Sequence, residues 1–370
     1  MKPTRCAAVV AAALAVLALV PASATAAPDV SAVPTGFAPA STSWTGPEHG
    51  FVLGYTDCGE PGWCPVLLET TDGGAHWRRL SAPPMSLPDN HNHVRLVAAS
   101  AQHLYVTDGS RILATRDGGR HWFTVLVAGG GQRYVSALAE AGGRIFAVVT
   151  SNSYGNTTSV YSGLAGAPVL APLPGFEVTG GITYGDLATG GGLQIALGAD
   201  YRTEEYWTSR DGVVFTPASP PCPSGTTASL SGVRAGQVIA LCSSSPGSPQ
   251  PGSSERRMWR APKLGGTFSG TADAPAVGIT QGFSAATADT ATVAAEGGGD
   301  GFLHHTTDGG RTWTTTVLSD RGVGLSDLAF IGDAADGVGV VVDGLPDAES
   351  GSAVYRTTDA GRTWVELSFS

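Results

Sequence analysis

The sequence is poor in charge, and in lysine above all. Only 14% of the 370 residues are Asp, Glu, Lys or Arg, and lysine occurs only at Lys2 and Lys263. The formal net charge is −10 and no cluster of Lys and Arg is present, which argues against nucleic acid as a partner. Because 42% of the residues are hydrophobic, low charge does not indicate an intrinsically disordered chain.

Long runs of strong helix formers are also missing, whereas Gly, Thr, Ser and Val occur throughout the chain. The 52 glycines and 24 prolines favour strands joined by turns and argue against a helical bundle. No stretch beyond the first 26 residues approaches the 18 or so apolar residues of a membrane-spanning helix. We therefore expect no transmembrane segment in the mature protein.

Residues 1–26 have the three parts of a secretory signal peptide. Lys2 and Arg5 form a positive region, an apolar region follows at 7–20, and Ala-Thr-Ala at 24–26 fits a cleavage site. We therefore expect an exported, secreted protein that begins at Ala27.

Four cysteines follow the expected cleavage site: Cys58, Cys64, Cys222 and Cys242. An even number in an exported chain predicts disulfides, and of the three possible pairings we favour the two local ones. Cys58 and Cys64 bracket a turn-rich loop, and Cys222 and Cys242 bracket two strand-like segments. No C-x-x-C pair is present, so we expect no zinc site.

An eight-residue motif, Thr-x-Asp-x-Gly-x-x-Trp, occurs at 70–77, 115–122, 306–313 and 357–364. A shortened copy occupies 209–215. The copies lie about 48 residues apart, or about twice that distance, which predicts degenerate units near residues 163 and 260. Val160–Leu164 and Met258–Pro262 are the candidates there, which makes seven units in total.

A period of 40 to 50 residues with four short strands per unit is typical of a β-propeller. We therefore predict an all-β protein, a seven-bladed β-propeller with four-stranded antiparallel blades, over residues 38–370, preceded by a linker at 27–37. In the last unit we expect strands at 323–330, 336–342, 352–356 and 364–369. The motif would then form the turn between the third and fourth strands.

The motif resembles the Asp-box, also called the BNR repeat. Its side chains bind backbone amides inside the turn, its glycine takes a positive φ, and its aromatic residue packs against the blade. We assign these residues a structural and not a catalytic role. They are Asp72, Gly74, Trp77, Asp117, Gly119, Trp122, Asp211, Gly212, Phe215, Asp308, Gly310, Trp313, Asp359, Gly361 and Trp364.

The resemblance implies that ligands bind on the face opposite the motif turns. Loops between second and third strands build that face, together with links between blades, one of which we expect at 171–181. The candidate ligand-binding residues there are Asp89, His91, His93, Arg95, Arg133, Tyr134, Tyr201 and Arg321. Other polar residues expected on that face are Glu177, Asp200, Glu204 and Glu205.

Five residues are candidates for catalysis: Arg95, Arg133, Tyr134, Glu204 and Arg321. His91 and His93 would point the same way on an extended strand and could bind a metal. An exposed polar loop also explains this pair, so we expect no metal and no cofactor.

Asp-boxes also occur in sialidases, which hold the substrate carboxylate with three convergent arginines. Residues 31–50, where one of these is usual, contain no arginine. The chain is also similar to seven-bladed assembly factors of photosynthetic membranes, through Gly50-Phe-Val-Leu-Gly54 ahead of Thr70. We favour an exported, non-catalytic, monomeric propeller that binds a protein or glycan partner at or outside the cell envelope. The alternative is a glycoside hydrolase of the exo-α-sialidase type that acts on acidic sugars.

Overall fold

The chain divides into Met1–Val30 and Ser31–Ser370, and everything below concerns the second unit. The computed structural model describes residues 32–59, 62–88, 94–128, 133–151, 156–233, 236–244, 251–321, 324–331, 337–347 and 350–369. The expected signal peptide lies outside these residues. The described part contains 28 strands and no helix, and so none that could cross a membrane. The prediction of an all-β protein is confirmed.

The strands form five four-stranded sheets and one eight-stranded sheet. The first sheet and the eight-stranded sheet contain β1 (Ala38–Trp44), β2 (Gly50–Asp57), β3 (Trp63–Thr70), β4 (Arg78–Leu80), β5 (Arg95–Ala98), β6 (Leu104–Thr107), β7 (Ile112–Thr115), β8 (Trp122–Val127), β9 (Arg133–Ala141), β10 (Arg144–Ser151), β11 (Asn156–Leu164) and β12 (Val169–Gly180). The next two sheets contain β13 (Thr183–Thr189), β14 (Leu193–Ala199), β15 (Arg202–Ser209), β16 (Thr216–Pro217), β17 (Thr226–Gly232), β18 (Val238–Ser244), β19 (Arg256–Ala261) and β20 (Ser269–Ala274). The last two contain β21 (Ile279–Ala285), β22 (Ala291–Gly297), β23 (Asp300–Thr306), β24 (Thr314–Ser319), β25 (Ser326–Ile331), β26 (Val338–Gly344), β27 (Ser352–Thr357) and β28 (Val365–Glu366).

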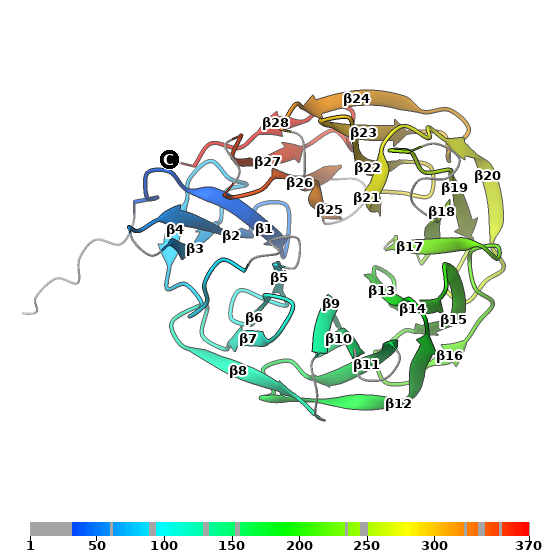
Figure 1. Ribbon diagram of the computed structural model, residues 1–370, viewed down its shortest axis with the longest axis horizontal. Coiled ribbons are helices and arrows are strands. Elements are labelled where there is room, and N and C mark those ends of the chain that lie inside the picture. The colour runs from blue at the N-terminus through cyan, green and yellow to red at the C-terminus, as the bar shows by residue number, and fades with distance from the viewer. Residues whose placement is uncertain are drawn as a thin grey trace, which may run out of the picture. The chain divides into compact units, whose positions relative to one another are not determined.

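The sheets of this unit stand in a ring around a central axis (Figure 1). The innermost strands contact one another in a closed circle: β1, β5, β9, β13, β17, β21 and β25. In each four-stranded sheet, and in each half of the eight-stranded sheet, the strands follow chain order from the axis outwards and pair antiparallel. The four strands expected in the last repeat lie close to β25, β26, β27 and β28. The two degenerate units, Val160–Leu164 and Met258–Pro262, lie at the ends of the third strands β11 and β19.

The eight-stranded sheet arises because two outermost strands pair with each other. Leu126 and Val127 of β8 run parallel to Val169 and Leu170 of β12. Twelve residues long, β12 occupies most of 171–181, where we had expected a link between blades. That expectation is wrong, because residues 171–172 and 177–180 of β12 pair antiparallel with β11.

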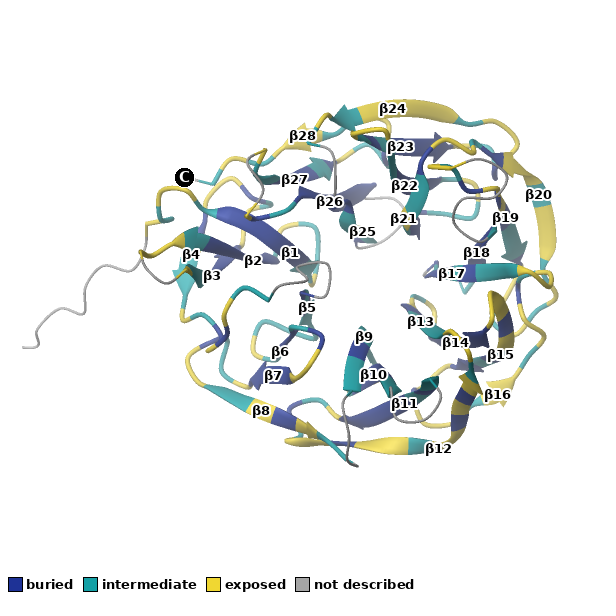
Figure 2. Ribbon diagram, viewed as in Figure 1, coloured by how far each residue is buried: buried dark blue, intermediate teal, exposed yellow. Residues whose placement is uncertain are grey.

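Apolar side chains fill the spaces between adjacent sheets. Phe51 and Leu53 of β2, both fully buried, pack with Leu96 of β5 and Leu104 of β6. Burying one such side chain stabilises the fold by about 1.5–3 kcal/mol. Burial is concentrated on the second and third strands of the sheets, such as β14 and β26, and the outermost strands are the most exposed (Figure 2).

The first and last sheets exchange no strand, so side chains close the ring. Val52 of β2 packs in one cluster with Val342 of β26 and Val354 of β27. Phe37, from the expected linker, lies edge-on to Phe369 with ring centroids 4.9 Å apart. The described end of the expected linker at 27–37 is therefore part of the contact between the first and last sheets.

Polar side chains on the inner strands also join neighbouring sheets. In each case a hydroxyl or carboxylate accepts a hydrogen bond from a backbone N–H of the next inner strand, and we call this contact an inner-strand clasp. The unpaired inner edge of each sheet would otherwise leave such N–H groups without an acceptor. The clasps are Ser41 to Leu96 N, Ser43 to Ala98 N, Asp186 to Leu230 N, Ser231 to Ala285 N, Ser284 to Phe330 N and Asp327 to Thr42 N.

The motif copies form the same turn between a third and a fourth strand. In the first copy, Thr70 Oγ1 accepts from Gly74 N at 2.9 Å, and Asp72 Oδ1 accepts from His76 N at 2.9 Å. Hydrogen bonds from the side chain and backbone of His76, and from Thr70, lower the pKa of Asp72 to about 2.

Both local cysteine pairings are confirmed, with disulfides at Cys58–Cys64 and Cys222–Cys242. The first closes the β2–β3 loop. The second ties the segment before β17 to β18, so that each bond joins chain segments that are already neighbours.

Candidate functional site

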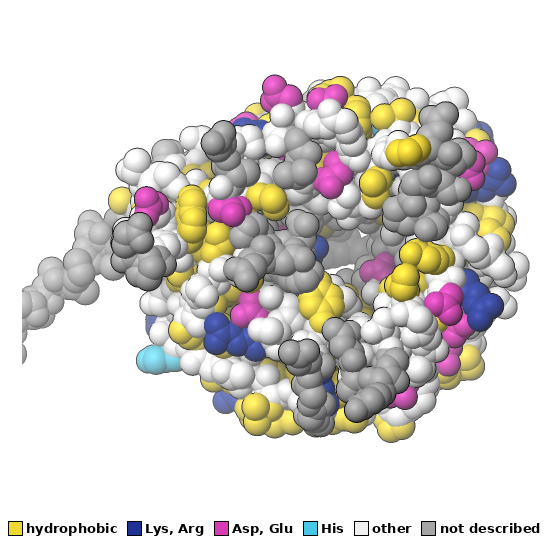
Figure 3. Space-filling view, in the orientation of Figure 1, with side chains coloured by type: hydrophobic (Ala, Val, Ile, Leu, Met, Phe, Trp, Pro, Cys, Tyr) yellow, Lys and Arg dark blue, Asp and Glu magenta, His cyan; other side chains and the backbone are white. Residues whose placement is uncertain are grey.

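The inner strands surround a cavity of about 790 Å³ on the axis of the ring. Its lining comes from β5, β9, β13, β17, β21, β25 and the hairpin between β14 and β15. The charged side chains of this lining are Arg95, Asp186 and Asp327, and Tyr184 and Tyr201 add two phenol rings. Figure 3 shows the hollow at the centre of the ring. Its volume lies in the range of small-molecule sites.

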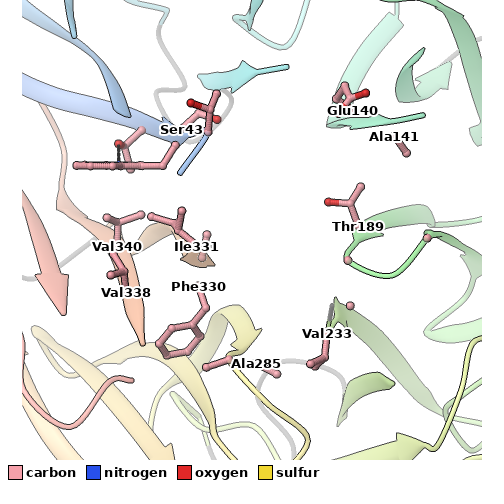
Figure 4. A pocket seen from close by; sticks show the side chains of 18 of the residues that line it. Ser43, Glu140, Ala141, Thr189, Val233, Ala285, Phe330, Ile331, Val338 and Val340 are labelled. Carbon is pink, nitrogen blue, oxygen red and sulfur yellow. Dashed lines mark hydrogen bonds between the residues drawn. The ribbon is translucent and has the colours of Figure 1, made fainter. Parts of the chain in front are cut away.

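A second space of about 510 Å³ adjoins it at the other ends of the inner strands. Ser43, Glu140, Thr189, Val233 and Phe330 are on its wall (Figure 4). Glycines and small or apolar side chains make up most of the remaining lining. Because a selective site needs a few directed polar groups, we take the larger cavity as the candidate site.

The backbone at Tyr201 is strained, and it places the ring beside the cavity. Asp200 and Tyr201 form a two-residue turn between β14 and β15, with φ of 49° and 61°. Asn-Gly is the favoured sequence for such a turn, and a left-handed tyrosine costs about 1 kcal/mol. Asp200 Oδ1 accepts from Ile182 N at 3.2 Å and so ties the turn to β13. Tyr201 is 38% exposed and Ile182 is 50% exposed.

Asp186 is a carboxylate of the cavity wall that backbone groups hold in place. Its Oδ1 accepts from Leu187 N at 2.9 Å and its Oδ2 from Leu230 N at 2.6 Å. Burial raises the pKa of Asp186 to about 6.

Asp327 occupies the related position in the last sheet. Its Oδ2 accepts from Thr42 N at 2.9 Å and from the Ser41 hydroxyl. Its Oδ1 lies 3.6 Å from Arg95 Nε. Burial raises the pKa of Asp327, while the Arg95 charge opposes that rise.

The structure does not bring the three predicted arginines together. Arg95 lines the cavity. Arg133 Nη1 donates to the carbonyls of Val127 and Ala128 at 2.9 and 2.7 Å, and its guanidinium lies 5.5 Å from the Tyr161 ring centroid. Arg133 thus holds the end of β8 beside the third strand β11.

Arg321 is held within the last sheet. Its Nη1 donates to Tyr355 Oη at 2.7 Å, and its Nη2 donates to Glu366 Oε2 at 3.3 Å. Its Nη1 also lies 3.5 Å from the buried Asp343 carboxylate. These partners lie on β26, β27 and β28, which are not the inner strand.

The predicted acidic residues have local partners. Glu204 pairs with Arg202 at 2.9 Å, and Glu205 accepts from Trp207 Nε1 at 3.3 Å. Glu177 accepts from Ser159 Oγ at 3.1 Å on the outermost strand β12. None of these three carboxylates lines the axial cavity in the described part of the chain.

The remaining predicted residues stand as follows. Tyr134, on β9, has its pKa raised by burial, and the Arg95 charge opposes the rise. Tyr201 lines the cavity, as described above. Asp89, His91 and His93 lie outside the described residues. Among those that are described, no group of three or more His, Cys, Asp or Glu could hold a metal ion.

Sequence reasoning missed Asp186, Asp327 and Tyr184. Each lies on an inner strand whose sequence shows an ordinary alternation of apolar and polar residues. The available signal was a lone aspartate in a strand, Asp186 in β13 and Asp327 in β25, because aspartate is depleted from strands.

No family model and no curated protein matches this sequence. Among solved structures, the chain is similar to YCF48 from Cyanidioschyzon merolae, with a TM-score of 0.46 and 16% identity over 84% of this chain and 94% of that one. It is similar to a GH74 enzyme from Niastella koreensis, with a TM-score of 0.33 and 12% identity over 89% of this chain and 65% of that one.

It is also similar to a prolyl endopeptidase, with a TM-score of 0.52 and 11% identity over 86% of this chain. The chain spans 48% of the endopeptidase and 65% of the GH74 enzyme. At such identities the likeness to the endopeptidase concerns the fold alone. Together with the closed ring of sheets, it identifies the fold as a β-propeller.

Proposed function

We propose that this protein is an exported, seven-bladed Asp-box propeller that binds a protein or glycan partner through its axial cavity and has no catalytic activity. The eight-stranded sheet counts as two blades, because β5 and β9 each supply an inner strand to the ring. Two disulfides fit an oxidising compartment outside the cytoplasm.

The exposed and strained Tyr201 is the observation that carries the proposal. Residues with a strained backbone persist where function uses them, and an exposed phenol ring is a common anchor for ligands. Ile182 adds an apolar surface next to the turn that holds this ring, and Arg95 supplies a directed donor in the same cavity.

Other contacts argue against glycoside hydrolysis. Arg133 and Arg321 bind strands and not a common point, so they do not form the clamp that a sialidase needs. Both oxygens of Asp186 accept backbone hydrogen bonds, and Glu204 is paired with Arg202. A general acid or base must instead reach the substrate directly.

Thermal-shift assays of the purified protein test the proposal. The panel contains sialic acid, neutral and acidic glycans and cell-wall fragments, and envelope extracts serve for pull-downs. A ligand at 100 times its Kd should add about 2.7 kcal/mol of stability. We expect Tyr201→Gly to abolish binding, because glycine accepts the same turn without the ring.

Leu164→Ala is the matched control, because Leu164 is 64% exposed and does not line the cavity. It should leave binding unchanged. Binding that survives Tyr201→Gly would contradict the proposed site. Glycoside turnover that is lost in an Arg95 variant would replace the proposal with the hydrolase alternative.

A further inference from the structure

Asp186 and Asp327 each accept a backbone hydrogen bond from the next inner strand, but only Asp327 has a positively charged neighbour among the described residues. Each forms an inner-strand clasp, and each lines the axial cavity. Asp327 has a cation beside it, since Arg95 Nε lies 3.6 Å from its Oδ1. Asp186 has only two backbone N–H groups as hydrogen-bond partners, and no ion pair within the described residues.

The described residues around Asp186 bring no positive charge to it. Its own strand contributes Tyr184, and the facing part of β17 contributes Ser229 and Ser231 to the cavity wall. Among the described residues, no lysine or histidine lines the cavity, and Arg95 and Asp327 are the other charged lining residues. The described lining thus holds two carboxylates and one guanidinium, and that guanidinium lies next to Asp327.

A carboxylate shielded from water is costly unless a cation compensates it. Asp186 lines the cavity, so a ligand bound there can supply that cation. Two aromatic rings, Tyr184 and Tyr201, also line the cavity and would attract a cation through their faces.

We propose that the axial cavity selects ligands that carry a primary ammonium group, and that this group pairs with Asp186 as Arg95 pairs with Asp327. The inference rests on the proposed binding function and adds the chemistry of the ligand. An amino sugar and a lysine side chain both offer this group, and the experiment distinguishes these carriers.

Calorimetric titration tests the inference with matched pairs of probes. One pair is a glucosamine trisaccharide and its fully N-acetylated form, and the other is an N-terminally acetylated lysine tripeptide and the same peptide acetylated at every Nζ. We expect at least one free amine to bind about tenfold more tightly than its acetylated partner at pH 7, which a difference of about 1.4 kcal/mol would produce. The pair that shows this preference identifies the carrier.

Asp186→Asn should remove the preference, whereas Asp273→Asn should keep it, because Asp273 is on β20 and does not line the cavity. An amide beside two N–H donors could also disturb the fold. Wild-type titrations between pH 5 and pH 7 therefore provide a second measurement. Affinity for the amine should rise roughly tenfold over this range as Asp186 loses its proton, with no rise for the acetylated form.

Equal affinity for free and acetylated amines would overturn this inference. If Tyr201→Gly still abolished that binding, the proposed function would stand. Failure of all four probes to bind would also overturn the inference, and the broader panel would then decide the proposed function separately.

Discussion

The Asp327 carboxylate in the last sheet accepts a hydrogen bond from the backbone N–H of Thr42 in the first sheet, with an N···O distance of 2.9 Å. The two residues are 285 positions apart in the chain. Since the first and last sheets exchange no strand, this clasp and the apolar junction behind it close the ring.

We expect Asp327→Asn to destabilise the protein by about 2 kcal/mol, measured by urea unfolding. The asparagine amide places an NH2 group where the carboxylate offered an oxygen to the Ser41 hydroxyl and the Thr42 N–H, both of which are donors. It also removes the negative charge beside Arg95. Asparagine tolerates the φ of 52° at this position, so backbone strain does not add to the effect. Ser284→Ala, which removes one clasp inside the chain, should cost about 1 kcal/mol. An equal or smaller loss for Asp327→Asn would show that the closing clasp has no special weight.

Gly361→Ala should be more destabilising than Gly298→Ala, by about 1–3 kcal/mol in unfolding experiments. Both glycines have positive φ, 93° and 67°, so both alanines meet backbone strain. At Gly361 the new Cβ would also lie 2.9 Å from Thr292 Oγ1 and 3.0 Å from His305 Nδ1, in the preceding sheet. At Gly298 nothing lies within 4 Å. Equal losses of unfolding free energy in the two variants would mean that the motif turn shifts to accept the new Cβ without an energetic cost.

The buried His304 should make the protein less stable in acid. Burial lowers the pKa of His304 to about 4, while the unfolded chain binds the proton near pH 6.5. Between these values the unfolded state binds more protons, so stability falls as the pH drops from 6.5 to 4, by up to about 3 kcal/mol.

His304→Gln should reduce this pH dependence, because glutamine does not titrate. His305 will keep part of it, since burial also lowers its pKa. His121→Gln is the control, as the His121 side chain is 88% exposed. If His304→Gln and His121→Gln gave the same slope of stability against pH, the assignment to His304 would be wrong.

The two disulfides should contribute unequally. Their cysteines are 6 and 20 positions apart, and the entropy lost by the unfolded chain grows with loop length. Replacing Cys222 and Cys242 by alanine should therefore cost about 3 kcal/mol, and replacing Cys58 and Cys64 about 2 kcal/mol. Thermal unfolding of both double variants measures this. The reverse order would show that native packing at the β2–β3 loop outweighs chain entropy.

Local features of this protein were predictable from its sequence. The motif turn depends on hydrogen bonds between residues two to four positions apart, such as Thr70 with Gly74 and Asp72 with His76. Strand alternation and the local disulfides likewise need only nearby residues, so the repeat and the all-β class follow from the sequence pattern.

The axial site was not predictable in the same way. Nothing in the sequence separates Arg95, Arg133 and Arg321. In the structure Arg95 lines the cavity, whereas Arg133 binds the end of β8 and Arg321 binds side chains of the last sheet. Tyr201 was predicted as a face residue, while the strain that presents its ring became visible only in the structure.

The repeat, the strands and the turns follow from the amino-acid sequence alone, because they arise from interactions within a few residues of the chain. How the ring closes, that β8 joins β12, and that Asp186 lines the cavity with no cation among the described residues beside it depend on the tertiary structure. These features depend on partners such as Thr42 for Asp327 and Leu230 for Asp186, which are 285 and 44 positions away. No local pattern encodes which side chain of one sheet meets which backbone group of the next.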